Sequence, residues 1–158
     1  MEVELTEEER EAVNRTLGRF AAVAKAQAPE GMYAAVSLKM RNGMIAQGLT
    51  EYVEDVMGQL RHCESNTEVP SLMNKGIKAM MKAFAIHNLP VYLFQIAGMF
   101  ELVGDSVNAK KFYRDFLQQQ RTFKPDGTDA TFQNAFVSSF YPEFDASKIV
   151  AIAIEKAR

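Results

Sequence analysis

Two short clusters in this 158-residue chain carry side chains that could do chemistry. His62, Cys63 and Glu64 are residue types that bind zinc, and the only other histidine, His87, would be a further ligand if the two segments were paired. Adjacent residues of a helix point about 100° apart, whereas a zinc site needs converging ligands. We therefore favour a packed Cys63 and a solvated His62 at a helix end, and we predict no metal or other cofactor.

Three carboxylates, Glu51, Glu54 and Asp55, form the second cluster. Paired carboxylates can act as general acid and general base. These three lie opposite Val53 and Val56 on an amphipathic segment, so a solvated helix face explains them better. The chain has neither a glycine-rich phosphate loop nor the nucleophile elbow of a serine hydrolase. Since no catalytic signature is present, we expect a protein that is not an enzyme.

Length and composition indicate one globular domain over residues 1–158. The hydrophobic fraction of 47% and the charged fraction of 24% are typical of a globular protein. The formal net charge is −2, so the chain lacks the basic excess of nucleic-acid-binding proteins. The single cysteine fits a reducing compartment, and the acidic start of the chain does not resemble a secretory signal. The longest apolar stretch, Val91–Val103, is too short to span a bilayer. We expect a cytoplasmic protein that binds neither nucleic acid nor membranes.

Apolar residues recur at helical spacing in every long segment, so the sequence predicts an all-α protein of about seven or eight helices. Glycines at 43 and 48 weaken the second helix, and a break near Asn42–Gly43 is an alternative to a continuous one. Thr6, Thr128 and Asp145 are expected caps. One helix, about 90–103, is apolar nearly all round and should be central. The predicted ranges are about 7–27, 32–48, 70–87, 90–103, 106–123 and 129–140, with a further helix capped by Thr50 and a last one after Asp145.

One segment, residues 93–117, has a pattern more specific than amphipathicity requires. Gly104 can end a helix because glycine tolerates positive φ, and Asp105 can cap the next helix. Apolar stripes flank this turn at helical spacing: Leu93, Ile96, Ala97 and Phe100 before it, and Ala109, Tyr113 and Phe116 after it. The arrangement resembles the tetratricopeptide repeat, a helix–turn–helix unit that binds partner peptides.

The resemblance implies antiparallel hairpins over about 50–88 and 89–124, with helical flanks over 6–48 and 128–158. The earlier hairpin is a degenerate copy of the later one. Such hairpins would stack as a right-handed superhelix. A compact α-bundle meets the same spacings and remains the alternative.

The resemblance also implies a function, the binding of another protein or peptide by an adaptor or chaperone-like module. In the family, the first helix of each hairpin lines a concave groove. Phe94 is the strongest candidate, since an aromatic side chain opposite the apolar stripe can anchor a partner. Carried over by position, the groove residues are Phe94, Gln95, Gly98 and Glu101 on one helix, and Glu54, Asp55, Gly58 and Arg61 on the other.

Two other classes of function stay open. A small-molecule-binding or enzymatic helical bundle would have a pocket between helices, with His87 or Tyr92 at its edge. A structural homo-oligomer, such as a homodimer, would associate through the apolar residues of the last helix, Ile149–Ile154.

Overall fold

The computed structural model describes residues 3–27, 37–63 and 68–158, and within these ranges the chain is all-helical. The prediction of an all-α protein with about seven or eight helices is confirmed. No helix among the described residues is long and apolar enough to cross a membrane. The helices are α1 (Glu7–Gln27), α2 (Leu38–Arg61), α3 (Val69–Ile86), α4 (Pro90–Leu102), α5 (Ser106–Thr122), α6 (Gly127–Phe140) and α7 (Ala146–Lys156).

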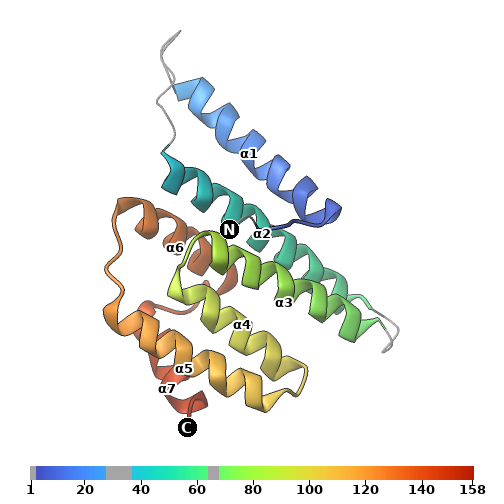
Figure 1. The fold of residues 1–158 in the computed structure, drawn as a ribbon, viewed down its shortest axis with the longest axis vertical. Coiled ribbons are helices and arrows are strands. Elements are labelled where there is room, and N and C mark those ends of the chain that lie inside the picture. Colours follow the sequence, from blue (N-terminus) through green and yellow to red (C-terminus); the bar gives the residue numbers. More distant parts are fainter. Residues whose placement is uncertain (1–2, 28–36, 64–67) are drawn as a thin grey trace.

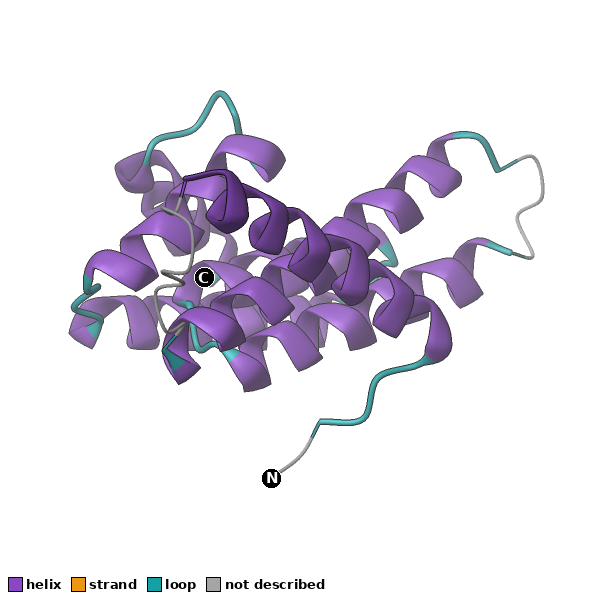
Figure 2. Cartoon of the chain, turned by 90° about the horizontal axis from the view of Figure 1, so that it is seen from above, coloured by secondary structure: helices purple, strands orange, loops and turns teal. Residues whose placement is uncertain are grey.

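The first five helices pack in sequence order, each on the next. Figure 1 shows them crossing the molecule from α1 (blue) to α5 (orange), with successive helices running in opposite directions. The last two helices return to earlier ones, because α6 packs against α2 and α7 packs against α5. Figure 2 shows the same helices from above. The return of α6 and α7 places C-terminal side chains beside residues of α2 and α4.

The core is centred on α4, as its apolar composition predicted. Every residue of this helix from Pro90 to Ala97 is buried. Proline suits the first helical turn because the missing N–H has no intrahelical partner there. Since α4 contacts both α3 and α5, its two opposite faces are covered.

The α4–α5 turn has the geometry that the sequence indicated. Gly104 adopts φ +79°, a conformation that favours glycine. Asp105 accepts a hydrogen bond from the Asn108 backbone N–H at 3.1 Å and so caps α5. Ala109 is buried, as are Tyr113 and Phe116 one and two turns further on. The predicted turn and the predicted inward stripe of α5 are both confirmed.

The predicted boundary between a helix over 32–48 and another capped by Thr50 is wrong for the described residues, because α2 is continuous from Leu38 to Arg61. Residues 32–36 of that prediction lie outside the described ranges. Gly48 does not break the helix but allows close packing: a Cβ there would lie 2.7 Å from the Cα of Val13 in α1. Gly43 is likewise covered by the Phe132 ring of α6. Close helix packing therefore outweighs the low helix propensity of glycine.

Side-chain caps explain where three helices begin. Thr6 and Glu9 exchange reciprocal hydrogen bonds at the start of α1, as predicted. Asp145 caps α7 through the Lys148 N–H at 2.8 Å, also as predicted. The cap of α6 is Asp126 and not Thr128, since Asp126 forms a capping box with Asp129.

Candidate binding cleft

An open cleft of about 600 Å³ lies where α2, α4 and the C-terminal helices meet. Its walls combine carboxylates, cations, aromatic rings and aliphatic side chains. The α2 wall consists of Glu54, Met57 and Arg61, and the α4 wall of Phe94, Gln95, Gly98, Glu101 and Leu102. The opposite side is formed by Tyr113 of α5 and by Ser139, Phe140, Tyr141, Phe144, Ile152 and Lys156.

Six of the groove residues expected from the sequence line this cleft together: Glu54, Arg61, Phe94, Gln95, Gly98 and Glu101. Asp55 is exposed on α2 and is not part of the lining, and neither is Gly58. The two walls come from the first helices of the two predicted hairpins. Helical spacing selected the face on each helix, and the packing of the helices brings the two faces to one surface.

Phe94 does not present a free ring to solvent. The side chain is only 5% exposed, and its centroid lies 5.7 Å from Tyr113 and 5.5 Å from Phe116. A third ring, that of Tyr141, packs against it with centroids 5.3 Å apart and planes at 75°. Edge-to-face contacts of this kind are favourable for aromatic pairs. The Phe94 ring is thus part of a four-ring cluster, and three of these rings, Phe94, Tyr113 and Tyr141, line the cleft and form its floor.

Tyr141 is the site residue that sequence reasoning missed, because the segment from Tyr141 to Asp145 reads as a break between helices. In the structure the Tyr141 hydroxyl donates a hydrogen bond to the Gln95 side-chain carbonyl. Burial raises the pKa of Tyr141, so the phenol keeps its proton and remains a donor at neutral pH. The available signal was the density of aromatic residues at 140–144, three in five positions.

The Tyr141 side chain projects from a tight turn. The Phe144 N–H donates to the Tyr141 carbonyl at 3.0 Å, and the two rings stack with planes 4° apart. Lys148 lies over the outer face of Phe144, with Nζ 4.7 Å from the ring centroid. The turn therefore presents two stacked rings, of which Tyr141 reaches Gln95.

Both carboxylates of the cleft accept hydrogen bonds, one of them within an ion pair. Glu101 accepts hydrogen bonds from Lys156 at 2.6 Å and from the Tyr113 hydroxyl at 3.2 Å. Burial, with the Glu101 carboxylate nearby, raises the pKa of Tyr113, which therefore also donates at neutral pH. On the α2 side, Glu54 accepts a hydrogen bond from Ser139. Each carboxylate of the cleft thus accepts at least one hydrogen bond from a neighbouring side chain.

The cleft is short. Glu54 and Arg61 are two helical turns apart on α2, which corresponds to about 10 Å at 1.5 Å per residue. Phe94 and Leu102 span about 12 Å along α4 on the same basis. An extended chain covers about 3.3 Å per residue, so about three or four residues of a ligand fit along the cleft.

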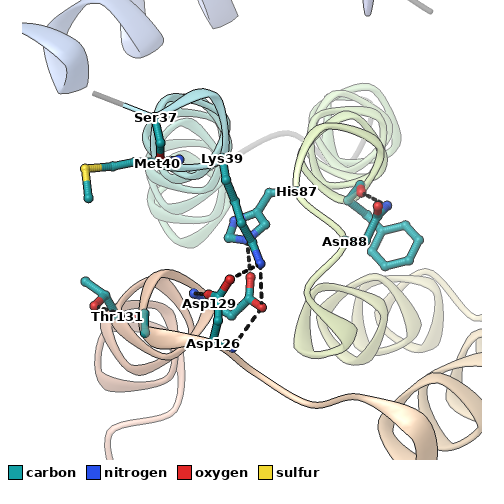
Figure 3. A network of polar contacts seen from close by, with 10 residues as sticks. Ser37, Lys39, Met40, His87, Asn88, Asp126, Asp129 and Thr131 are labelled. Carbon is teal, nitrogen blue, oxygen red and sulfur yellow. Dashed lines mark hydrogen bonds and ion pairs between the residues drawn. The ribbon is translucent and has the colours of Figure 1, made fainter. Parts of the chain in front are cut away.

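A second polar cluster is enclosed between α2, α6 and the α3–α4 connection (Figure 3). His87 Nε2 lies 2.8 Å from Asp129 Oδ1, and Lys39 Nζ lies 3.0 Å from Asp129 Oδ2. Burial works to raise the pKa of Asp129, but hydrogen bonds from His87 and Lys39 outweigh it and hold that pKa below its ordinary value. His87 and Asp129 are both only 6% exposed, so their contact joins the α3–α4 connection to α6 inside the protein.

The residues considered for zinc do not come together. His62 and Cys63 precede α3, whereas His87 follows it, roughly 27 Å away along an 18-residue helix. Glu64 lies outside the described ranges. Within those ranges, no group of three or more His, Cys, Asp or Glu side chains is placed to hold a metal ion.

The last helix packs on α5 through Ile149 and Ala153, while Ile154 points outward and is 49% exposed. An association of two chains through this helix is still a prediction. Tyr92, considered as a pocket-edge group, is 1% exposed and lines a small cavity of about 50 Å³ beside Glu54 and Phe136.

Comparison of the chain with protein-family models, curated proteins and solved structures finds no match. The fold and the cleft define an all-helical protein with a short, partly aromatic groove.

Proposed function

We propose that this chain is a non-enzymatic adaptor or chaperone-like module that holds a short segment of another protein in the cleft between α2 and α4. One observation carries the proposal: six residues chosen from repeat-like spacing line a single open cleft of about 600 Å³. That volume lies within the range typical of ligand sites. The first helices of two consecutive hairpins supply its main walls, as in a peptide-binding helical repeat.

The chemistry of the cleft favours an apolar or aromatic ligand segment over a charged one. Glu54 and Glu101 are balanced by Arg61 and Lys156, so the lining has no excess of either charge. Met57 and Ile152 add aliphatic surface beside the aromatic floor. Apolar and aromatic groups that enter such a groove supply most of the binding free energy, while the charged rim sets orientation. The single cysteine fits a cytoplasmic partner.

The alternative of a small-molecule enzyme receives less support. Its two candidate polar groups, His87 and Tyr92, are buried, and neither lines the cleft. The carboxylates within the cleft come from different helices and accept hydrogen bonds from Ser139, Tyr113 and Lys156. A pair of carboxylates poised for acid–base work would need one of them to be available to a substrate.

A random peptide library displayed on phage and selected against the full-length chain tests the proposal. We expect selected peptides to bind with micromolar affinity and to lose at least tenfold in affinity when Gly98→Leu fills the cleft. The substitution is compatible with the helix, because a Cβ at Gly98 would meet only the Tyr113 hydroxyl, at 3.9 Å. The matched control is Gly18→Leu on α1, where nothing lies within 4 Å and the cleft is remote.

The selection has two outcomes. Peptides that bind wild type and Gly18→Leu alike but lose affinity for Gly98→Leu support the proposal. Failure to select any peptide, or selected peptides that bind Gly98→Leu as tightly as wild type, would remove the cleft as the binding site.

A further inference from the structure

We infer that a small cavity between α2 and α6 binds the ammonium group of an alkylamine, which is either a free amine or the side chain of a lysine in the segment that the cleft holds. The cavity has a volume of about 50 Å³. The ammonium site does not depend on the proposed function, and only its lysine source rests on that function.

The walls of this cavity combine carboxylates with aromatic rings. Glu51 and Glu54 come from α2, Phe132, Phe136 and Ser139 from α6, and Tyr92 from α4. The rings of Tyr92 and Phe136 meet edge to face, with centroids 5.0 Å apart and planes at 80°. None of the described residues that line the cavity is cationic. Since carboxylates and the faces of aromatic rings both attract ammonium groups, the wall chemistry is that of an ammonium site.

Glu54 supplies the charge that such a ligand would compensate. Its carboxylate accepts a hydrogen bond from Ser139 but forms no ion pair with a cation of the described residues. Arg61, the nearest cation along the same helix face, is two turns or about 10 Å away. Glu51, by contrast, is already paired with Arg19. The cavity therefore has the uncompensated negative charge of one carboxylate at its wall.

The Tyr92 hydroxyl is a buried polar group that lacks a partner. The residue is 1% exposed and lines the cavity, and within the described part of the chain its hydroxyl forms no hydrogen bond. Burial raises the pKa of Tyr92, so the phenol stays neutral and its oxygen can accept from an N–H group. Buried polar groups normally have partners. A water molecule would satisfy the phenol, whereas an ammonium group with its three donors satisfies the phenol and compensates Glu54 as well.

The size of the cavity favours a primary ammonium group. A water molecule takes up about 30 Å³ of the liquid, so the cavity has room for about two groups of that size, the nitrogen and the carbon bonded to it. The rest of the alkyl chain has to lie outside. Glu54 and Ser139 line both the cavity and the cleft, and both side chains are exposed. An alkylamine therefore enters from the cleft with its nitrogen first, and its chain remains beside the aliphatic surface of Met57.

The probe is n-butylamine, which has the length of a lysine side chain and is protonated at neutral pH. It is titrated into the full-length chain and followed by the amide signals of an NMR spectrum. We expect saturable shifts in α2 and α6 with a dissociation constant in the low millimolar range. Two comparison ligands, the uncharged 1-butanol and the bulkier tetramethylammonium ion, should bind at least about tenfold more weakly.

Three variants assign the bound amine to the cavity. Glu54→Gln should weaken butylamine binding at least about tenfold, since the carboxylate is its counter-ion. Tyr92→Phe removes only the unpartnered hydroxyl and should weaken binding about threefold without lowering the melting temperature. Tyr92 does not line the cleft, so this variant separates the cavity from the cleft. The matched control is Asp55→Asn, at the next residue of α2, which is exposed and does not line the cavity.

The source of the ammonium group follows from the peptides selected on phage. If a lysine supplies it, replacement of that lysine by norleucine should weaken peptide binding at least about tenfold in wild type but not in Glu54→Gln. Butylamine binding together with peptides that need no lysine would support the site and assign it to free amines.

The inference is overturned if butylamine causes no saturable shift, or if it binds Glu54→Gln as tightly as wild type. Equal binding of 1-butanol and butylamine would overturn it too, because the cavity would then not distinguish a cation. If selected peptides still depend on Gly98 in any of these cases, the proposed function stands and only the ammonium site is wrong.

Discussion

His87 Nε2 lies 2.8 Å from Asp129 Oδ1, and this buried contact ties the α3–α4 connection to the first turn of α6. Lys39 of α2 bonds the other oxygen of the same carboxylate at 3.0 Å. One aspartate thus joins three parts of the chain while it also closes the capping box of α6. The position of α6, and with it the turn that carries Tyr141, depends on this residue.

Replacement of Asp129 by alanine should lower the free energy of unfolding by about 2–4 kcal/mol, because it removes half of the capping box together with the buried hydrogen bond to His87 and the ion pair with Lys39. The control is Asp126→Ala, which removes the exposed cap of the same helix and should cost only about 1 kcal/mol. Urea denaturation followed by circular dichroism measures both. Equal losses for the two variants would mean that the contact with His87 adds nothing to the cap.

Acid should destabilise the protein partly through Asp129. Because the folded-state pKa of this carboxyl lies below its ordinary value of 3.8, the ionised form is bound more tightly in the folded state. Its contribution is present above pH 3.8 and is lost as the pH falls through the lower, folded-state pKa. The free energy of unfolding should therefore fall more steeply with acid in wild type than in Asp129→Asn. Parallel profiles for the two proteins below pH 5 would contradict this assignment.

Gly48→Ala should destabilise by about 1–3 kcal/mol, because the new methyl group would meet the backbone of Val13 at 2.7 Å and α1 would have to move. Gly18→Ala is the matched control, since nothing lies within 4 Å of it and alanine favours the helix by up to about 1 kcal/mol. Thermal melts of the two variants should shift in opposite directions. A stabilising Gly48→Ala would show that α1 does not pack this closely on α2.

Phe94→Ala should cost about 3–5 kcal/mol of stability, since a buried ring with three aromatic neighbours is removed. A ring that only a partner contacts would, when truncated, weaken partner binding alone. The contact of Tyr141 with Phe94 instead predicts a loss of stability. Val107→Ala, at a side chain 79% exposed, should stay within about 0.5 kcal/mol of wild type. A Phe94→Ala protein as stable as wild type would mean that its ring does not support the cleft floor.

Ala109→Leu should destabilise by about 1–3 kcal/mol through overpacking, because Ala109 is 4% exposed on the face of α5 that meets α4. Lys110→Leu adds the same side chain at an exposed position of the same helix and should be nearly neutral. Thermal melts measure the melting temperatures of the Ala109→Leu and Lys110→Leu variants. Equal melting temperatures would place Ala109 outside the interface between α4 and α5.

Local interactions account for what could be predicted from the sequence. The caps at Thr6, Asp105 and Asp145 act over three residues, so they are visible as short motifs. The stripes of α4 and α5 depend only on helical spacing, which is why Gln95 and Gly98 could be named as groove residues. The predicted break before Thr50 was wrong because Gly48 allows α2 to pack closely on Val13 of α1. That contact involves a separate helix, so no pattern within the α2 segment indicates it.

Tyr141 and Asp129 could not be predicted for the same reason. The Tyr141 hydroxyl bonds a residue 46 positions away, and Asp129 bonds His87 across 42 positions. Neither pair leaves a pattern within a window of a few residues. Such contacts depend on the path of α6, which short connections and amphipathic stripes do not determine.

The return of α6 to α2 has a consequence for how the molecule unfolds. Helices that contact only their sequence neighbours form a linear array, which can fray from either end in separate steps. Here α6 packs on α2 and also reaches the α3–α4 connection and α4 through the Asp129–His87 and Phe136–Tyr92 contacts, so α2, α3, α4 and α6 form a closed loop of contacts. Opening any member of that loop exposes the others, so these four helices should exchange their amide protons as one cooperative unit. Helix α1 packs mainly on α2, with fewer contacts to α3 (such as Glu9 to Lys82, 2.6 Å) and to α6 (Phe20 to Phe132), so we expect fraying to begin there.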